Sequence, residues 1–211
     1  VPVLKRVLDR SVRSASAALM AKRAGLLVSL GGDGTLLGAA HLAAPLSKPV
    51  LGVNLGGLGF MTAVAPEKLA LQLSQLLKGS CRIDDRRLVR AVIIRKGRKP
   101  VLLDALNDLS IARVGAGRLV HMETSVDGRF LATLRADGLV FSSPTGSTAY
   151  SLSLGGPVLD PGAPVMLLTP VAPHTLSARP LVLKESSVLE MVLPSGTVEI
   201  AAPGKHPVRL K

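Results

Sequence analysis

A glycine-rich turn that directly follows an apolar run is the sequence feature that most constrains the fold of this chain. Residues 31–35 read Gly-Gly-Asp-Gly-Thr, and residues 26–30 before them are almost entirely apolar. The run predicts a buried strand, and residues 36–40 after the turn are compatible with a helix. Glycines let backbone N–H groups approach a ligand closely, and such a turn beside a helix N-terminus suits phosphate. Because a carboxylate there repels phosphate, we expect Asp33 to accept a proton, hold a metal or bind a hydroxyl.

The first part of the chain alternates predicted helices and strands. We expect helices over residues 15–24, 35–44 and 66–77 and strands over residues 26–30 and 49–53. This alternation implies a parallel sheet, with ligands at the carboxyl ends of its strands. The second strand runs into another glycine-rich turn, so we expect both turns at that edge.

After Cys81 the pattern changes to short β-rich segments separated by turn signals. The expected strands are residues 89–94, 109–112, 121–126, 130–134, 139–141, 165–169, 180–183 and 189–193. Asp127-Gly128 between two of them is a hairpin signal. The fold class that follows is a Rossmann-like α/β N-terminal domain with a parallel sheet, residues 1–80, and an all-β, sandwich-like C-terminal domain, residues 81–211.

Composition narrows the class of partner. A formal net charge of +12 fits either nucleic-acid binding or the handling of anionic small molecules. Aromatic residues make up only 2% of the chain, so a platform on which bases could stack is nearly absent and we expect no nucleic-acid partner. There is no run of 18 apolar residues, residues 1–13 do not resemble a signal peptide, and one cysteine fits a reducing compartment. We therefore expect a cytoplasmic protein with no membrane partner.

Two polar segments of the second half are suited to a sugar. Residues 142–153 contain eight hydroxyl side chains in twelve positions, more than a polar turn between strands requires. Hydroxyls both donate and accept hydrogen bonds, which suits ribose and amide groups. Asn107-Asp108 lies between apolar neighbours and fits either an Asx-type turn or a clamp for vicinal ribose hydroxyls.

Together these motifs resemble those of the NAD kinase family over about residues 26–183. The matching segments are residues 31–35, 54–60, 107–108, 137–157 and 173–180. The string from Thr145 to Tyr150 with the Gly-Gly-Pro downstream is the most specific of them. The Gly-Gly-Asp-Gly-Thr turn alone is shared with diacylglycerol and sphingosine kinases.

The resemblance implies transfer of the γ-phosphoryl group of ATP to the 2′-hydroxyl of the adenosine ribose of NAD, giving NADP. It also implies a divalent metal, usually Mg²⁺, with no side chain assigned as its ligand, and a homodimer or homotetramer. Asp33 takes the position of the catalytic proton acceptor. The implied NAD-binding positions are Asp33, Gly34, Asn107, Asp108, His121, Arg135, Asp137, Thr148, Ala149, Tyr150, Ser151, Leu152, Ser153 and Ala172. The implied phosphate- or ATP-binding positions are Gly31, Gly32, Gly34, Thr35, Gly56, Gly57 and Gly59.

The sequence also departs from the family pattern. Members usually begin with a further strand and helix and carry a late Asp-Gly-Gln-type turn, and neither is found here, so we expect segments to be missing at both ends. Arg135 and Asp137 are implied to reach a ligand across a subunit interface. Two alternatives stay open, namely a lipid kinase of the diacylglycerol or sphingosine type that shares the Asp33 turn, and a non-catalytic dinucleotide-binding protein.

Overall fold

A computed structural model describes residues 15–56, 59–62, 64–115, 119–175 and 177–210 of the chain. The chain divides into two compact units, Val1–Cys81 and Arg82–Lys211, and each is described by itself. Residues 1–13 and Gly57, on which two of the expectations above rest, lie outside the described residues.

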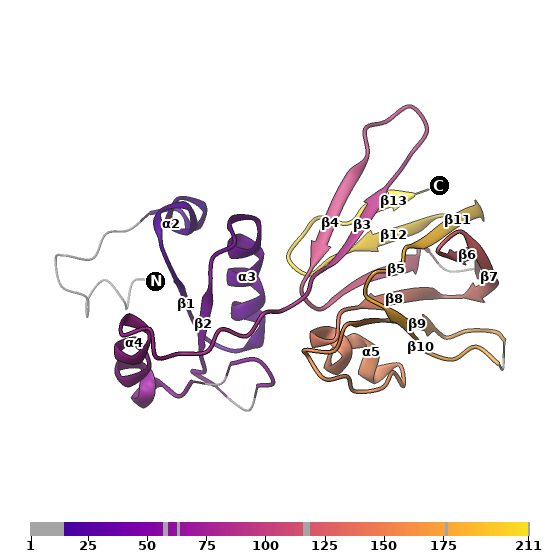
Figure 1. Ribbon diagram of the computed structural model, residues 1–211. Helices are drawn as coiled ribbons and strands as arrows, with labels where there is room; N and C mark the ends of the chain where they lie inside the picture. The colour runs from indigo at the N-terminus through magenta and orange to yellow at the C-terminus, as the bar shows by residue number, and fades with distance from the viewer. Residues whose placement is uncertain (1–14, 57–58, 63, 116–118, 176, 211) are drawn as a thin grey trace. The chain divides into compact units, whose positions relative to one another are not determined.

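The first unit contains a β–α–β arrangement (Figure 1). Its elements are α2 (Ala17–Arg23), β1 (Leu27–Leu30), α3 (Asp33–Ala43), η1 (Ala44–Leu46), β2 (Val50–Val53), η2 (Pro66–Lys68) and α4 (Leu69–Leu77). β1 and β2 pair in parallel, in a register that runs from Leu27 opposite Val50 to Leu30 opposite Val53. A parallel pair needs a crossover connection, and α3 supplies it. The alternation of helices and strands predicted for this part of the chain is therefore confirmed.

Helix α3 packs closely on this sheet, beside the edge at which the glycine-rich turns begin. Leu36 of α3 and Val53 at the end of β2 are both buried. A Cβ added at Gly52 of β2 would lie 3.2 Å from the Leu36 side chain, so the helix packs closely over the strand. The carboxyl ends of both strands, where residues 31–35 and 54–59 begin, thus lie at one edge of the sheet.

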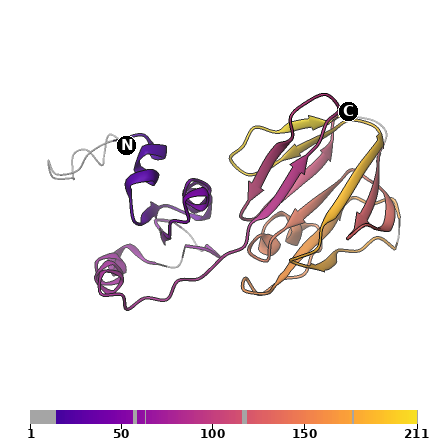
Figure 2. The same ribbon diagram turned by 45° about the horizontal axis from the view of Figure 1, so that its top comes forward.

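The second unit is built from three antiparallel sheets (Figure 2). The six-stranded sheet has the order β10-β9-β8-β5-β12-β13, the three-stranded sheet β11-β6-β7, and the two-stranded sheet β3-β4. The strands are β3 (Val89–Ile93), β4 (Val101–Ala105), β5 (Asp108–Arg113), β6 (Val120–Val126), β7 (Arg129–Ala136), β8 (Gly138–Ser142), β9 (Val165–Val171), β10 (Leu181–Lys184), β11 (Leu189–Ser195), β12 (Val198–Ala201) and β13 (Val208–Leu210).

One hydrophobic core joins all three sheets. Buried residues from each contribute to it, including Ile93, Met122 and Leu139. The β6–β7 turn at Asp127-Gly128 has positive φ at both residues, 51° and 73°, which is the geometry of a tight hairpin. The predicted hairpin and the predicted β-rich second half are confirmed.

Some elements of this unit were not predicted. Residues 145–153, for which no helix or strand was predicted, form a short 3-10 helix η3 (Thr145–Thr148) and a single turn of helix α5 (Tyr150–Ser153). β12 and β13 come from the C-terminal tail, in which Pro and Gly interrupt the alternation of apolar and polar residues that marks a strand.

Candidate active site

Asp33 lies at the junction of β1 and α3. Helix α3 begins at Asp33, with Gly32 as its N-cap and no side-chain capping hydrogen bond. Gly31 before it has a φ of 153°, and a Cβ there would lie 2.4 Å from the Thr35 hydroxyl oxygen. The turn therefore needs glycine at position 31, and it places the Asp33 carboxylate at the positive end of a helix.

The Asp33 carboxylate accepts four hydrogen bonds from the segment after the second glycine-rich turn. The backbone N–H of Phe60 donates to Oδ2 at 2.9 Å. The backbone N–H groups of Met61 and Thr62 donate to Oδ1, each at 3.1 Å, and the Thr62 hydroxyl donates to Oδ1 at 3.3 Å. The two turns, separated by more than twenty residues, are thus joined through one side chain.

These contacts determine the charge state of Asp33. Partial burial of the carboxylate raises its pKa, but the hydrogen bonds from Phe60, Met61 and Thr62 together lower the pKa below its ordinary value. Asp33 is therefore ionised at neutral pH and can accept a proton.

The glycines predicted to bind phosphate separate into two groups. Gly31 and Gly59 are required by packing, because a Cβ on Gly59 would lie 2.6 Å from Asp33 Oδ1. The remaining described glycines, Gly32, Gly34 and Gly56, have open space where a Cβ would lie, and their φ angles are not positive. Packing thus does not explain glycine at these three positions, whereas the close approach of a ligand does.

Two of the glycines predicted to bind phosphate already donate their backbone N–H to another group of the chain. The Gly31 N–H donates to the Val53 carbonyl at 2.9 Å, and the Gly56 N–H donates to the Asn54 side-chain oxygen at 2.9 Å. Thr35, at the first turn of α3, is exposed, and its N–H donates to the Gly32 carbonyl at 3.0 Å.

In the second unit, Asn107 lies against the start of the hydroxyl-rich segment. Its backbone carbonyl accepts from the Ser143 N–H at 2.8 Å. A Cβ on Gly146 would lie 2.0 Å from that carbonyl oxygen, so only glycine allows the two backbones to approach this closely. The side-chain oxygen Oδ1 of Asn107 is buried and has no hydrogen-bond partner among the described residues. A buried acceptor without a partner is costly, and a ligand that donates to it removes that cost.

Asp108 follows as the first residue of β5 and is 7% exposed. Burial raises the pKa of its carboxyl, although a hydrogen bond from the Tyr150 backbone N–H lowers it in part. Asp108 and Tyr150 therefore join β5 to α5.

The six predicted residues from Thr148 to Ser153 surround this contact. Thr148 ends η3, Ala149 is the N-cap of α5, and Tyr150 to Ser153 form α5. The side chains of Tyr150 and Leu152 are exposed, whereas Ser151 is buried and shares a 2.7 Å hydrogen bond with Thr169. The Ser153 hydroxyl donates to the Tyr150 carbonyl at 2.7 Å. The Tyr150 backbone N–H thus contacts Asp108, and the buried Ser151 anchors the turn of helix to β9.

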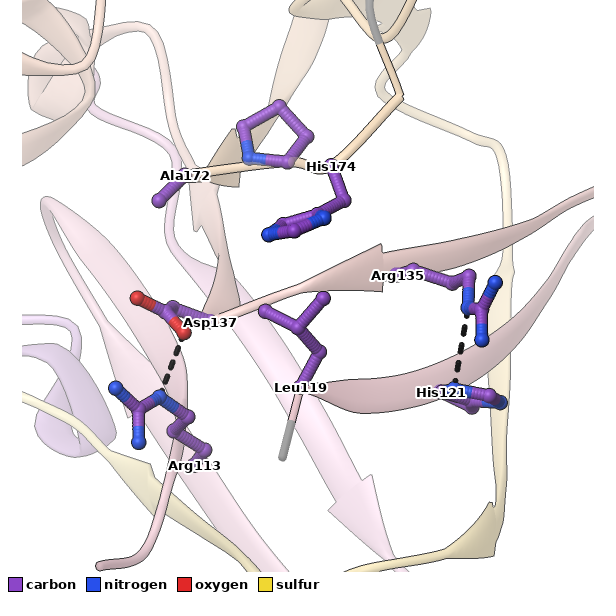
Figure 3. Close-up of a pocket in the computed structure, with 8 residues that line it drawn as sticks. Arg113, Leu119, His121, Arg135, Asp137, Ala172 and His174 are labelled. Atoms are coloured by element: carbon purple, nitrogen blue, oxygen red, sulfur yellow. Dashed lines mark hydrogen bonds and ion pairs between the residues drawn. The ribbon is translucent and has the colours of Figure 1, made fainter. Parts of the chain in front are cut away.

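Four further predicted residues come together around one open cavity of about 780 Å³ in the second unit (Figure 3). They are His121, Arg135, Asp137 and Ala172. The structure adds four residues that were not predicted as site residues, namely Arg113, Leu119, Pro173 and His174. Arg113 gives no sequence signal, since it ends an ordinary strand, whereas Pro173 and His174 belong to a segment already matched to the family.

Polar contacts order the walls of this cavity. Arg113 Nε lies 2.6 Å from Asp137 Oδ1, and Arg135 Nε donates to His121 Nε2 at 3.2 Å (Figure 3). The His174 N–H donates to the Arg135 carbonyl at 2.9 Å, and Ala172 has a φ of 43° that turns the chain out of β9 toward His174. Two arginines against a single carboxylate give the cavity an excess of positive charge at neutral pH, which suits an anionic or electron-rich ligand.

Two other features of the described residues bear on function. They contain no group of three or more His, Cys, Asp or Glu side chains arranged to hold a metal ion. No helix within the described ranges is long and apolar enough to cross a membrane.

Comparison with known proteins finds matches to two domain families along the chain. Residues 5–81 match the ATP-NAD kinase N-terminal domain, and residues 106–210 match the ATP-NAD kinase C-terminal domain. The NAD kinase of Bordetella pertussis is 44% identical over 182 residues, covering 86% of this chain and 61% of that protein. The NAD kinase of Moorella thermoacetica is 43% identical over 187 residues, covering 88% of this chain and 60% of that protein. The chain thus spans about three fifths of the length of these relatives.

Solved structures show the same fold. Yeast NADH kinase complexed with NADH has a TM-score of 0.85 and 31% identity, covering 93% of this chain and 57% of that one. The NAD kinase of Archaeoglobus fulgidus in complex with ATP has a TM-score of 0.73 and 26% identity, covering 98% of this chain and 79% of that one. With both domain families matched in order along the chain and the Asp33 turn in place, this chain belongs to the NAD kinase family.

Proposed function

We propose that this chain is an NAD kinase that transfers the γ-phosphoryl group of ATP to the 2′-hydroxyl of the adenosine ribose of NAD. The observation that carries the proposal is the ionised Asp33 carboxylate, held at the N-terminus of α3 by four hydrogen bonds. An alcohol is a weak nucleophile whose proton must leave as the O–P bond forms, and a positioned base contributes about 10²–10⁴-fold to such a step.

In the proposed reaction, Asp33 accepts the proton of the 2′-hydroxyl as its oxygen attacks the γ-phosphorus. The bond between the γ-phosphorus and the bridging oxygen breaks, and ADP leaves. Positioning and charge stabilisation supply most of the remaining acceleration in phosphoryl transfer. The open space beside Gly32, Gly34 and Gly56 supports close approach of phosphate oxygens to the backbone at these turns.

The divalent metal, Mg²⁺ in the proposal, arrives with the donor nucleotide. Mg²⁺ is usually bound by one or two carboxylates together with substrate phosphates rather than by an all-protein cage. The described residues offer no such cage, and both Asp33 oxygens already accept hydrogen bonds from the chain. When bound, the metal neutralises charge on the phosphates, and none of the proton-transfer steps above depends on it.

We assign the recognition of NAD to the second unit. The unpartnered oxygen of Asn107 and the buried carboxylate of Asp108 are suited to accept hydrogen bonds from vicinal ribose hydroxyls. Helix α5 is joined to this pair by the hydrogen bond from the Tyr150 backbone N–H to Asp108, and it carries the exposed side chains of Tyr150 and Leu152.

The cavity lined by Arg135 and Asp137 is proposed to receive part of a dinucleotide held by another subunit of a homodimer or homotetramer. Its positive charge suits the negatively charged pyrophosphate of NAD or NADP. The exposed, free Cys81 fits the reducing cytoplasm, which we propose as the location of the protein.

A coupled assay tests the proposed function. The protein is incubated with NAD and ATP-Mg²⁺, and NADP is detected with a dehydrogenase that reduces NADP but not NAD, with a parallel reaction containing diacylglycerol in place of NAD. We expect NADP to form and the lipid to stay unphosphorylated. Phosphorylation of the lipid without NADP would support the lipid-kinase alternative, and binding of NAD without turnover would support a non-catalytic dinucleotide-binding protein.

A further inference from the structure

The two oxygens of the Asp33 carboxylate are used unequally. Oδ1 accepts three hydrogen bonds, two from backbone N–H groups and one from the Thr62 hydroxyl, whereas Oδ2 accepts one from the Phe60 N–H. A carboxylate oxygen has two lone-pair directions, so Oδ1 is saturated and Oδ2 keeps one direction open. An incoming hydroxyl can therefore give its proton to Oδ2.

We infer that Thr62 is a positioning residue for the proposed reaction: its hydroxyl is a third donor to Oδ1 and holds the carboxylate in the rotation that leaves the open lone pair of Oδ2 for the acceptor hydroxyl. This inference rests on the proposed function of Asp33 as the base. It adds Thr62, a residue outside the Gly-Gly-Asp-Gly-Thr turn, to the residues on which turnover depends.

The hydroxyl is the part of this contact that depends on residue identity. Any amino acid except proline at positions 61 and 62 would donate its backbone N–H to Oδ1, but only Thr or Ser adds a hydroxyl on Cβ, close to the backbone. Thr62 is 4% exposed, and its methyl group lies 3.2 Å from the position of a Cβ on Gly52, so its side chain has little freedom to turn away.

Gly59 makes the contact possible from the other side. A Cβ at this position would lie 2.6 Å from Asp33 Oδ1 and 2.8 Å from the Thr62 hydroxyl oxygen. The glycine therefore leaves room for the carboxylate and the hydroxyl to meet, which is a reason for its presence that phosphate binding does not provide.

Loss of the Thr62 hydroxyl changes the acidity of Asp33 in one direction. A hydrogen bond to the charged form lowers the pKa of a carboxyl, and the Thr62 hydroxyl is one of the groups that lower the pKa of Asp33. Of the elements packed on α3, helix α2 carries the basic side chains Lys22 and Arg23, whereas β1 and β2 carry no titratable side chain. His41 lies at the far end of α3 from Asp33. Removal of the Thr62 hydroxyl should therefore raise the Asp33 pKa.

Two substitutions separate positioning from packing. Thr62→Val keeps the methyl group against Gly52 and removes the hydroxyl, whereas Thr62→Ser keeps the hydroxyl and removes the methyl group. Thr124→Val is the matched control, because Thr124 is a fully buried threonine of β6 whose hydroxyl donates to the Ala132 carbonyl at 2.7 Å in the second unit.

We expect Thr62→Val to lower kcat about 10-fold, the low end for a hydrogen bond to a charged group, because two N–H donors to Oδ1 remain. KM for ATP and NAD should change little, and the acid limb of the kcat profile should move to higher pH. Thr62→Ser should keep kcat and the acid limb of its pH dependence near wild type, even if its melting temperature falls below that of Thr62→Val. Thr124→Val should leave the acid limb at its wild-type pH.

A titration that needs no turnover completes the test. The carboxyl carbon of Asp33 is followed by NMR in protein labelled with ¹³C-aspartate, and its signal is assigned by its loss in Asp33→Asn. A titration of Asp33 that moves to higher pH in Thr62→Val and not in Thr62→Ser supports the part of the inference that concerns the contact between the Thr62 hydroxyl and Asp33. A wild type that forms no NADP overturns the proposed reaction, and with it the positioning role of Thr62, whatever the titration shows. An unchanged titration in Thr62→Val, or an equal loss of kcat in the Val and Ser variants, overturns it.

Discussion

Substitution of Gly146 by alanine should damage the NAD site without removing any polar group. The new Cβ would lie 2.0 Å from the Asn107 carbonyl oxygen, 2.3 Å from its carbon and 2.6 Å from its Cα. All three atoms belong to the backbone, so no rotation of a side chain relieves the overlap. Ordinary contact begins near 3.4 Å. The segment that holds Asn107 must therefore move by about 1 Å or more.

A displacement of about 1 Å in a positioning group costs on the order of 10²-fold in rate. We therefore expect Gly146→Ala to lower kcat/KM for NAD about 100-fold, with a smaller effect on KM for ATP. Overpacking of this kind also destabilises a protein by about 1–3 kcal/mol, so the melting temperature should fall by several degrees.

Steady-state kinetics with each substrate varied in turn, together with a melting curve, measures both effects. Gly38→Ala is the matched control, because Gly38 is an exposed residue within α3 with nothing within 4 Å of an added Cβ. Alanine in a helix is more favourable than glycine by about 0.5–1 kcal/mol, so this variant should be slightly more stable and fully active. Wild-type NAD kinetics in a folded Gly146→Ala protein would refute the reasoning.

Four further predictions concern the two carboxylates and the assembly of the protein. Asp33→Asn should lower kcat by at least about 100-fold while calorimetry still detects NAD binding, and near-normal turnover would exclude Asp33 as the base. The contributions of the Asp33 and Asp108 carboxylates to the stability of the fold should change with pH in opposite directions. The folded pKa of Asp33 is lowered, so its stabilisation is present at neutral pH and is lost as pH falls through that pKa, whereas the raised folded pKa of Asp108 gives stabilisation that is present at low pH and is lost as pH rises through it. Scanning calorimetry at pH 7 should therefore find Asp33→Asn less stable and Asp108→Asn more stable than wild type, and equal shifts would contradict this. Asp108→Asn should also lower kcat/KM for NAD, by about 10- to 150-fold. If the cavity around Arg135 receives a ligand held by another subunit, specific activity should fall on dilution together with the mass measured by light scattering, and a fully active monomer would contradict that assignment.

Much of the fold could be predicted from local patterns. Strands β1 and β2 follow from apolar runs that lead into glycine-rich turns, and the β6–β7 hairpin follows from Asp127-Gly128 because few other residue pairs adopt two positive φ angles. Such features depend on residues close in sequence. The strand β13 does not, because it is stabilised by pairing with β12, and its three residues are too few for their alternation to mark a strand.

The candidate site divides in the same way. Asp33 could be identified because a carboxylate within a glycine turn is chemically unusual. The four donors that hold it could not, since Phe60, Met61 and Thr62 lie more than twenty-five residues away and three of the contacts use backbone N–H groups that carry no sequence signal. Likewise Arg113 reaches the cavity only because β5 ends beside Asp137. The sequence thus identified reactive groups more readily than the groups that orient them.

The central claim concerns the atom that receives the phosphoryl group, and transfer of a labelled phosphate tests it most directly. The protein is given ATP labelled with ³²P at the γ position and either NAD or the analogue of NAD that lacks the 2′-hydroxyl on its adenosine ribose. We expect label on NAD and none on the analogue, with transfer lost in Asp33→Asn. Label on the 2′-deoxy analogue, or transfer that survives in Asp33→Asn, would contradict the account.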